Sequence, residues 1–159
     1  MRRETSDPDE IRNTLGRFMN SFDLKDWTLM AEQLEPRIRV DYRGLRGDPP
    51  QELDAADYVN ARAQALQHLA THHLLGNVEV AVAGDCASVG ASCMIWRSRG
   101  AAQFHSHAYY RFTMVRRGAA WKIGAIEQRI FWSEGDPGIH PGVGRGRDSS
   151  STRTPRRIE

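Results

Sequence analysis

Lysine is scarce in this sequence. Lys25 and Lys122 are the only two, and the other 20 of the 22 basic residues are arginine. We attribute this bias to a GC-rich bacterial genome rather than to chemistry. An excess of either charge is also missing, because the net charge is only +2. Residues 136–159 alone have a net charge of +2, so the body before them is neutral overall. We therefore expect no nucleic-acid partner, since such proteins concentrate Lys and Arg on a folded surface.

Cysteine and long apolar runs are scarce as well. Cys86 and Cys93 are the only cysteines, and they lie in one predicted strand. Their odd spacing points them to opposite faces of that strand, which makes a disulfide between them geometrically unfavourable. The sequence has no apolar run of about 18 residues and no charged-then-apolar leader. We therefore expect a soluble, cytoplasmic protein without a membrane partner.

The first half of the chain shows helical spacing. With 159 residues, the chain is long enough for one domain with a sizeable core. Ser6–Glu10 has the capping residue, the early proline and the acidic residues of a helix start. Apolar residues follow it at helical intervals. The further elements predicted in this half are a helix over 27–34, a strand over 38–42, a loop over 44–52 and a third helix over 55–69.

From His72 onward the hydrophobic period changes to two, and glycine-containing turns separate the segments. This pattern predicts strands joined as an antiparallel meander, over residues 72–83, 86–98, 102–116 and 119–132. Helices followed by a long meander are typical of an α+β fold. Because the strands are long, we expect a strongly curved, mostly antiparallel sheet wrapped around three helices. A pocket would then lie between the helices and the concave face of the sheet.

The C-terminal segment 136–159 differs in composition from the rest. It consists mainly of Gly, Pro, Ser, Thr and Arg. Such a segment cannot bury enough apolar area to offset the cost of ordering, so we expect it to be largely disordered. The domain would then span residues 1–135. Ile139–Val143 could fold across the mouth of the pocket as a partial lid.

The strand over residues 103–115 indicates which side chains face the pocket. Its even positions are clearly more apolar than its odd positions, so the even set should face inward. Ser106 and Tyr110 are then pocket residues, whereas His105 and His107 lie on the outer face. No third ligand lies near these two histidines in the sequence, and we expect no metal. The outer face is a plausible contact surface in a homo-oligomer, either a dimer or a trimer.

Two segments far apart in the chain carry a carboxylate, a phenol and an imidazole. Asp23 and Tyr42 lie in the first segment, and His73 lies in the second. His72 and His73 are adjacent, so one faces inward and the other outward, and alternation alone does not say which. Asp23 could cap the next helix, but Asp26 competes for that role and leaves Asp23 free. Tyr42 taken alone fits a core tyrosine equally well.

Four short segments carry a family resemblance: Phe22–Trp27, Val40–Tyr42, Thr71–His73 and Trp121–Ile123. Together they resemble the scytalone dehydratase and SnoaL-like branch of the nuclear transport factor 2-like superfamily. The resemblance implies a cone-shaped α+β barrel with a deep pocket and a chemistry that needs no cofactor. It also implies that Asp23 orients His73 and that His73 is the general base or acid. Tyr42 would hold a water or a substrate oxygen.

The same resemblance implies which residues surround a small-molecule substrate. Ser106 falls where the dehydratases have a pocket serine. Phe22 stands where they have a tyrosine, and Ala108 replaces a pocket asparagine. Arg97 or Ser98 takes the place of a second histidine. Because part of the polar set is lost, we expect a cyclic, apolar polyketide-like substrate other than scytalone. The expected substrate-binding residues are Phe22, Trp27, Ser106, Tyr110 and Phe131.

The predicted function is thus an acid–base dehydratase or cyclase, and two alternatives remain open. An epoxide hydrolase on the same fold would need a buried network of polar groups. Glu127 and Arg129 on the last strand are candidates for it, although they suit a plain salt bridge equally well. The second alternative is a ligand-binding or assembly subunit. In that case Asp23 and His73 would be only a buried polar pair.

Overall fold

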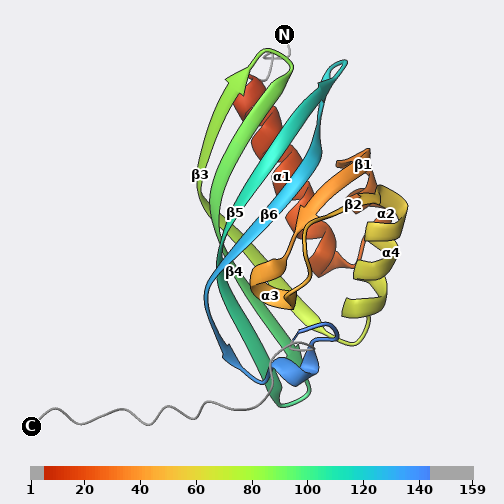
Figure 1. The fold of residues 1–159 in the computed structure, drawn as a ribbon, viewed down its shortest axis with the longest axis vertical. Coiled ribbons are helices and arrows are strands. Elements are labelled where there is room, and N and C mark those ends of the chain that lie inside the picture. Colours follow the sequence, from red (N-terminus) through yellow and green to blue (C-terminus); the bar gives the residue numbers. More distant parts are fainter. Residues whose placement is uncertain (1–5, 144–159) are drawn as a thin grey trace, which may run out of the picture.

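A long N-terminal helix and four long strands dominate the fold. The computed structural model describes residues 6–143. Its elements are α1 (Asp7–Leu24), α2 (Trp27–Glu32), β1 (Leu34–Asp41), α3 (Arg43–Arg46), β2 (Gln51–Asp54), α4 (Ala55–Leu66), β3 (Ala70–Ala83), β4 (Cys86–Arg99), β5 (Ala102–Arg117), β6 (Ala120–Gly135) and the 3-10 helix η1 (Pro137–Ile139). Figure 1 shows β3 to β6 bending around α1, with α2, α4 and the short strands gathered on one side. The predicted α+β architecture is confirmed.

The strands form one sheet of six in the order β2-β1-β6-β5-β4-β3. β3 to β6 form the predicted antiparallel meander, and their ends agree with the predicted ends within a few residues. β1 pairs with β6 in parallel, so the sheet is mixed. The β5–β6 ladder shifts register between His107 and Ala108 and again between Thr113 and Met114. Such irregularities help a long sheet to curve.

Residues 44–52 differ from the predicted loop, because this segment contains part of α3 and the start of β2. Gly47 ends α3, and its φ of 82° lies in the left-handed region that favours glycine. β2 is short and lies at the edge of the sheet, which explains why it lacks a clear alternation. The helices predicted over 27–34 and 55–69 are α2 and α4, which are shorter than predicted and end at Glu32 and Leu66.

The turn between α1 and α2 decides where Asp23 points. α1 is closed by Lys25, which has a left-handed φ of 55° and donates its backbone N–H to the carbonyl of Phe22. Asp26 then caps α2 by accepting a 2.9 Å hydrogen bond from the backbone N–H of Leu29. Because Asp26 fills the capping position, Asp23 is free to turn toward the sheet.

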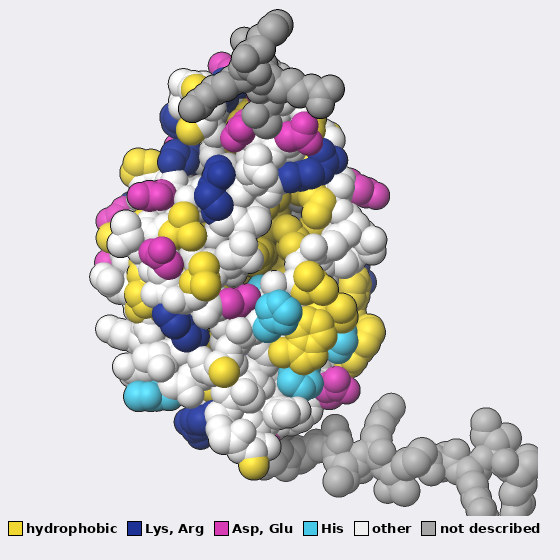
Figure 2. Space-filling model, turned by 180° about the vertical axis from the view of Figure 1, so that it is seen from behind, with side chains coloured by type: hydrophobic (Ala, Val, Ile, Leu, Met, Phe, Trp, Pro, Cys, Tyr) yellow, Lys and Arg dark blue, Asp and Glu magenta, His cyan; other side chains and the backbone are white. Residues whose placement is uncertain are grey.

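The outer face of the sheet carries stacked aromatic and histidine side chains. His72 stacks on Trp96 with ring centroids 5.7 Å apart, and His107 stacks on Trp132 at 4.2 Å. Figure 2 shows histidines gathered around hydrophobic side chains on this side of the molecule. We refer to this surface as the outer patch. It consists of His72, Leu74, Met94, Trp96, His105, His107 and Trp132.

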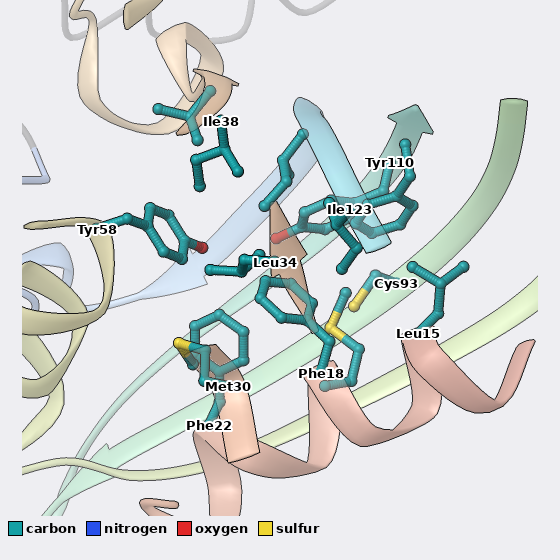
Figure 3. Packing of buried hydrophobic residues seen from close by; sticks show 14 of the residues in the cluster. Leu15, Phe18, Phe22, Met30, Leu34, Ile38, Tyr58, Cys93, Tyr110 and Ile123 are labelled. Carbon is teal, nitrogen blue, oxygen red and sulfur yellow. The ribbon is translucent and has the colours of Figure 1, made fainter. Parts of the chain in front are cut away.

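The core fills the space between α1 and the concave face of the sheet. Figure 3 shows side chains from the helices and strands meeting there. Phe18 of α1 packs edge-on against Phe112 of β5, with ring centroids 6.5 Å apart. Full burial of such a side chain contributes about 1.5–3 kcal/mol to folding. The even positions of β5 from 104 to 114 are all buried, as predicted: Phe104, Ser106, Ala108, Tyr110, Phe112 and Met114.

The residues that follow β6 return to the body of the protein. Asp136 donates its backbone N–H to the carbonyl of Gln103 at 2.8 Å, and its carboxylate caps η1. Ile139 and His140 are buried. Of the segment 136–159 that was predicted to be largely disordered, residues 144–159 lie outside the described residues. None of the helices within residues 6–143 is long and apolar enough to cross a membrane.

Candidate active site

The concave face of the sheet presents its side chains in rows that cross the strands. Thr71, Arg97 and Phe104 are register partners and form one row. His73 and Ser106 belong to the next row, with one residue of β4 between them. Register partners point to the same face of a sheet, so both rows face α1. These rows place the polar groups of three strands close together.

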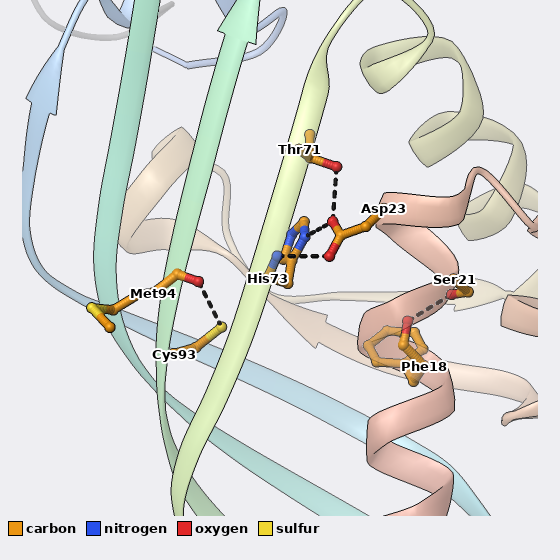
Figure 4. Close-up of polar contacts among 7 residues, drawn as sticks. All are labelled: Phe18, Ser21, Asp23, Thr71, His73, Cys93 and Met94. Atoms are coloured by element: carbon orange, nitrogen blue, oxygen red, sulfur yellow. Dashed lines mark hydrogen bonds and ion pairs between the residues drawn. The ribbon is translucent and has the colours of Figure 1, made fainter.

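Asp23 and His73 form a close polar pair, which we call the dyad. Asp23 Oδ1 lies 2.7 Å from His73 Nδ1, and Asp23 Oδ2 accepts a 2.8 Å hydrogen bond from the backbone N–H of His73. Thr71 donates its hydroxyl to Asp23 Oδ1 at 2.9 Å. Figure 4 shows the carboxylate reaching from the end of α1 to β3. The structure thus brings together the carboxylate and the imidazole that the sequence predicts as partners.

The protonation states of the dyad follow from its surroundings. Burial raises the pKa of Asp23, but the hydrogen bonds from His73 and Thr71 outweigh this and hold it below the ordinary value. Burial lowers the pKa of His73, and Asp23 offsets this only in part. The positive charges of Arg97 and Lys25 lower it further. Because a carboxylate only accepts hydrogen bonds, Nδ1 of the neutral imidazole carries the proton and Nε2 can accept one.

The two adjacent histidines take opposite faces of β3. His73 is buried and stacks on Phe22, with ring centroids 4.6 Å apart and an interplanar angle of 27°. His72 is exposed and belongs to the outer patch. The alternation left this choice open, and the contact with Asp23 identifies His73 as the inward residue. Phe22 covers one face of its imidazole.

Tyr42 lies in a separate contact network. Its hydroxyl is 2.8 Å from the hydroxyl of Tyr58 on α4. The guanidinium groups of Arg46 and Arg62 lie 5.0 and 5.9 Å from the centre of its ring. Burial raises the pKa of Tyr42, so it is a neutral phenol at neutral pH. Among the described residues no hydrogen bond joins Tyr42 to the dyad, and a water or ligand would have to connect them.

Two of the predicted substrate-binding residues are deeply buried. Ser106 accepts a 2.9 Å hydrogen bond from Arg97 and a 3.3 Å hydrogen bond from Ser133. The Tyr110 hydroxyl accepts a 2.6 Å hydrogen bond from Gln128. Figure 3 shows the hydroxyl of Tyr110 pointing into the interior. Burial raises the pKa of Tyr110 well above its ordinary value, so this phenol also stays neutral.

Trp27 and Phe131 are less enclosed. Trp27 is half-buried against the core at the start of α2. Phe131 is the extra residue at the bulge where β6 passes from Ile130 to Trp132 opposite β5. Phe131 is 51% exposed and lines the larger of two cavities instead of the interior beside the dyad. The bulge changes the alternation of β6 at this point, which sequence spacing alone does not reveal.

Two cavities adjoin Arg46. The larger has a volume of about 720 Å³ and is bounded by α3, Phe104, β6 and residues around η1. The smaller has a volume of about 280 Å³ and lies beside Tyr42 and Tyr58. Arg46 lines both cavities. Asp23 and His73 are not among the described lining residues of either cavity.

Sequence reasoning did not predict the burial of two basic residues of this interior, Arg97 and His140. Arg97 shares the strand parity of Cys93 and Ile95, which could have indicated that it faces inward. Burial and the charges of Arg97 and Arg46 lower the pKa of His140 to about 4, and no local pattern predicts this burial. In the part of the chain that the structure describes, no three His, Cys, Asp or Glu residues are grouped as metal ligands.

Comparison with known proteins places this geometry in a family. A model of the SnoaL-like domain matches residues 3–127. The chain belongs to the SnoaL-like family. Its curved sheet with packed helices is the nuclear transport factor 2-like fold. The resemblance carried by Phe22–Trp27 and Thr71–His73 is thereby confirmed at the level of family and fold.

Among its relatives, the chain is similar to the scytalone dehydratase of Colletotrichum orbiculare. The two are 23% identical over 155 residues, which cover 89% of this chain and 81% of the relative. The solved structure of the Kfla4162 protein from Kribbella flavida has a TM-score of 0.79 at 22% identity, covering 84% of this chain and 95% of that one. A hexachlorocyclohexane dehydrochlorinase has a TM-score of 0.66 at 17% identity, covering 84% and 93%. At these identities the solved structures establish the shared fold.

Proposed function

We propose that this SnoaL-like protein is an acid–base lyase or isomerase, a dehydratase or cyclase that acts on a small cyclic, polyketide-like molecule. The observation that carries this proposal is the dyad. Its buried imidazole lies with Nδ1 2.7 Å from a carboxylate and keeps Nε2 unprotonated. Such an imidazole can remove a proton from a bound molecule. The chemistry uses side chains alone and requires no cofactor.

In the proposed reaction, His73 Nε2 removes an acidic proton, most simply from a carbon next to a carbonyl group. Asp23 stabilises the imidazolium that forms, because its carboxylate is already ionised and is held in place by Thr71. The proton then passes to a leaving hydroxyl, which departs as water. Alternatively, the proton returns to a different carbon, or the carbanion closes a ring. These outcomes are a dehydration, an isomerisation and a cyclisation.

Tyr42 has the proposed role of stabilising the oxygen on which negative charge develops. Its phenol is neutral, so it can donate a hydrogen bond to such an oxygen, directly or through a water. Its hydroxyl already pairs with that of Tyr58, and Figure 3 shows the Tyr58 hydroxyl directed into the interior. The two hydrogen-bonded hydroxyls could therefore reorient together as negative charge develops on the substrate oxygen.

The proposed substrate is cyclic and largely apolar. Phe22 covers the imidazole, and Trp27 and Tyr110 add aromatic surface to the same interior. The similarity to a scytalone dehydratase supports a cyclic substrate. Ala108 provides no polar group beside Ser106, which supports a substrate with fewer polar substituents than scytalone.

The geometry favours this proposal over an epoxide hydrolase. That activity would need a buried network of polar groups, for which Glu127 and Arg129 were the candidates. Both side chains are exposed, so they contribute nothing to a buried site. A non-catalytic binding subunit remains the competing proposal, and only a measurement of turnover separates it from an enzyme.

We further propose that Ile139–Val143 acts as a partial lid. Pro137 and Val143 line the larger cavity, while Ile139 and His140 are buried against the body of the protein. The charge of Arg97 acts on His140, so this segment extends from the lining of the larger cavity to the interior around Arg97. Its displacement would open a path from the cavity toward the dyad.

We also propose that the protein is a homo-oligomer that associates through the outer patch. Leu74, Met94 and Trp132 expose 49%, 37% and 56% of their surfaces on this one face. Carboxylates are scarce on it, since Glu134 is the acidic residue beside His107. A second copy of the same surface would bury these side chains without bringing like charges together.

Deuterium exchange tests the proposed function before the natural substrate is known. The protein is incubated in heavy water with a panel of cyclic ketones, including hydroxylated tetralones, and uptake at the α-carbon is measured by mass spectrometry. Wild type should catalyse exchange on at least one compound, and His73→Ala should not. Exchange at equal rates in both proteins would refute the assigned base. Binding of the panel without any exchange or turnover would favour the binding subunit.

A further inference from the structure

Arg97 is buried on the concave face without an acidic partner. The residue is 4% exposed. Its Nη1 donates a 2.9 Å hydrogen bond to Ser106 Oγ, and its guanidinium lies 5.3 Å from the centre of the Phe104 ring. None of the ion pairs among residues 6–143 includes Arg97. Its remaining N–H groups therefore have no negative group to bind.

The acidic side chains that interact with Arg97 do not neutralise its positive charge. Burial raises the pKa of Cys93 to about 12 and raises the pKa of Tyr110 well above its usual range. Both are therefore neutral at neutral pH. The carboxylate of Asp23 is engaged by Thr71 and by its dyad partner. Burial lowers the pKa of Arg97 only to about 10, which leaves the guanidinium charged.

Additional positive charge surrounds the same region. The charges of Arg97 and Arg46 both act on His140, which burial already keeps neutral. Arg46 Nε is buried and has no hydrogen-bond partner among the described residues. A buried charge without an opposite charge is strongly unfavourable. The interior is thus built to receive negative charge from outside the chain.

We propose that Arg97 binds an anionic oxygen group of the substrate, namely a carboxylate or an enol or phenol that is ionised before it binds. The planar guanidinium matches such a group through paired N–H donors. Ser106 occupies only the Nη1 side, which leaves the other N–H groups for the ligand. This inference rests on the proposed function, because it assigns the anion to the substrate of that reaction.

The register of the sheet places Arg97 beside the dyad. Arg97 is the cross-strand partner of Thr71, which in turn donates to Asp23. His73 follows two positions later on the same face of β3. Cross-strand partners have Cβ atoms about 4.5–5.5 Å apart, and diagonal neighbours lie about 7–8 Å apart. A molecule of one or two rings can span this separation. Its anionic group on Arg97 would then determine which carbon faces Nε2 of His73.

Benzoate and benzamide test this inference, because they have the same shape and differ in charge. Binding to the full chain is measured by calorimetry at neutral pH and constant ionic strength. Wild type should bind benzoate about tenfold or more tightly than benzamide, the scale of a charge-assisted hydrogen bond. Arg97→Met should remove this preference. Arg97→Gln keeps a hydrogen bond to Ser106 and gives the same test if the methionine variant does not fold.

Arg62 provides the matched control. It is also a buried arginine outside the ion pairs of the described residues, and Arg62→Met should keep the benzoate preference. Equal binding of the two probes to wild type would overturn the anion site. A preference that survives in the Arg97 variants, or that disappears in Arg62→Met instead, would overturn it as well.

Asp23→Asn distinguishes this inference from the proposed function. The variant should lose deuterium exchange and retain the benzoate preference, because the dyad and Arg97 are separate groups. Wild-type exchange without a benzoate preference would remove the anion site and leave the function standing. A benzoate preference without any exchange would leave the anion site standing and remove the proposed function.

Discussion

Asp23 holds His73 by both its ring and its backbone. One carboxylate oxygen lies 2.7 Å from Nδ1, and the other accepts the backbone N–H at 2.8 Å. The contact joins the end of α1 to β3 and fixes the orientation of the imidazole. Because a carboxylate only accepts hydrogen bonds, it also fixes the tautomer, with the proton on Nδ1. Lys25 makes this possible, because its left-handed backbone ends α1 directly after the turn that carries Asp23.

Replacing His73 by alanine should lower the rate of α-proton exchange or turnover by about 10²–10⁴-fold, the usual contribution of a general base. His72→Ala is the matched control, because the neighbouring imidazole lies on the outer face and should leave the rate unchanged. Circular dichroism of both variants checks that the fold is kept. A loss of rate in His72→Ala alone would show that the wrong histidine has been assigned.

The pKa of His73 should respond in opposite directions to its two charged neighbours. Burial keeps this pKa below the ordinary value of about 6.5. Asp23 raises it, so Asp23→Asn should lower the pKa further. Arg97 lowers it, so Arg97→Met should raise it. NMR titration of the His73 ring measures all three proteins. An identical midpoint in wild type and Asp23→Asn would mean that the dyad does not exist in solution.

The part of the site that could be predicted from sequence depends on two local rules, helix capping and strand alternation. Helix capping predicted that Asp26 leaves Asp23 free, and Asp26 does cap α2. Strand alternation predicted that Ser106 and Tyr110 face inward, and both are buried. Each rule involves residues that are close together in the chain, so neither requires knowledge of distant contacts.

The parts that could not be predicted depend on distant pairing. The choice between His72 and His73 was settled only by the reach of Asp23 from α1. Strand parity could have placed Arg97 on the inner face, but its position beside the dyad depends on its pairing opposite Thr71. Arginine is also among the residue types that are mostly exposed. The parallel pairing of β1 with β6 likewise joins segments that no local pattern relates. Tertiary packing therefore decides the electrostatics of the site.

The two cysteines should differ strongly in reactivity. Cys86 is exposed, whereas burial raises the pKa of Cys93 to about 12 and keeps it a thiol. A thiol reagent at pH 8 should therefore modify Cys86 in the native protein and reach Cys93 only in denaturant. The variant Cys86→Ala should show no fast reaction. Rapid labelling of this variant would contradict the burial of Cys93.

Gly135→Ala should destabilise the protein and disturb the segment around η1. Gly135 has a φ of 94°, and a Cβ there would lie 2.2 Å from the Gln103 carbonyl oxygen. Gly118 also has a positive φ, of 62°, but a Cβ there meets nothing within 4 Å. Gly118→Ala should thus cost about 1–2 kcal/mol from its backbone conformation alone. Urea denaturation should show a larger loss for Gly135→Ala, and equal losses would contradict the backbone clash.

Association through the outer patch should be abolished by a charge at its exposed centre. Trp132 is 56% exposed and stacks on His107, so Trp132→Glu would place a desolvated carboxylate in a contact between two copies. Light scattering should show an oligomer for wild type and a monomer for this variant. Leu24→Glu is the control, because Leu24 is 70% exposed at the end of α1, away from the patch, and should leave the oligomer intact. A monomeric wild type would refute the homo-oligomer, and an oligomer that persists in Trp132→Glu would place the contact elsewhere. A loss of association in both variants would point instead to a surface that includes the end of α1.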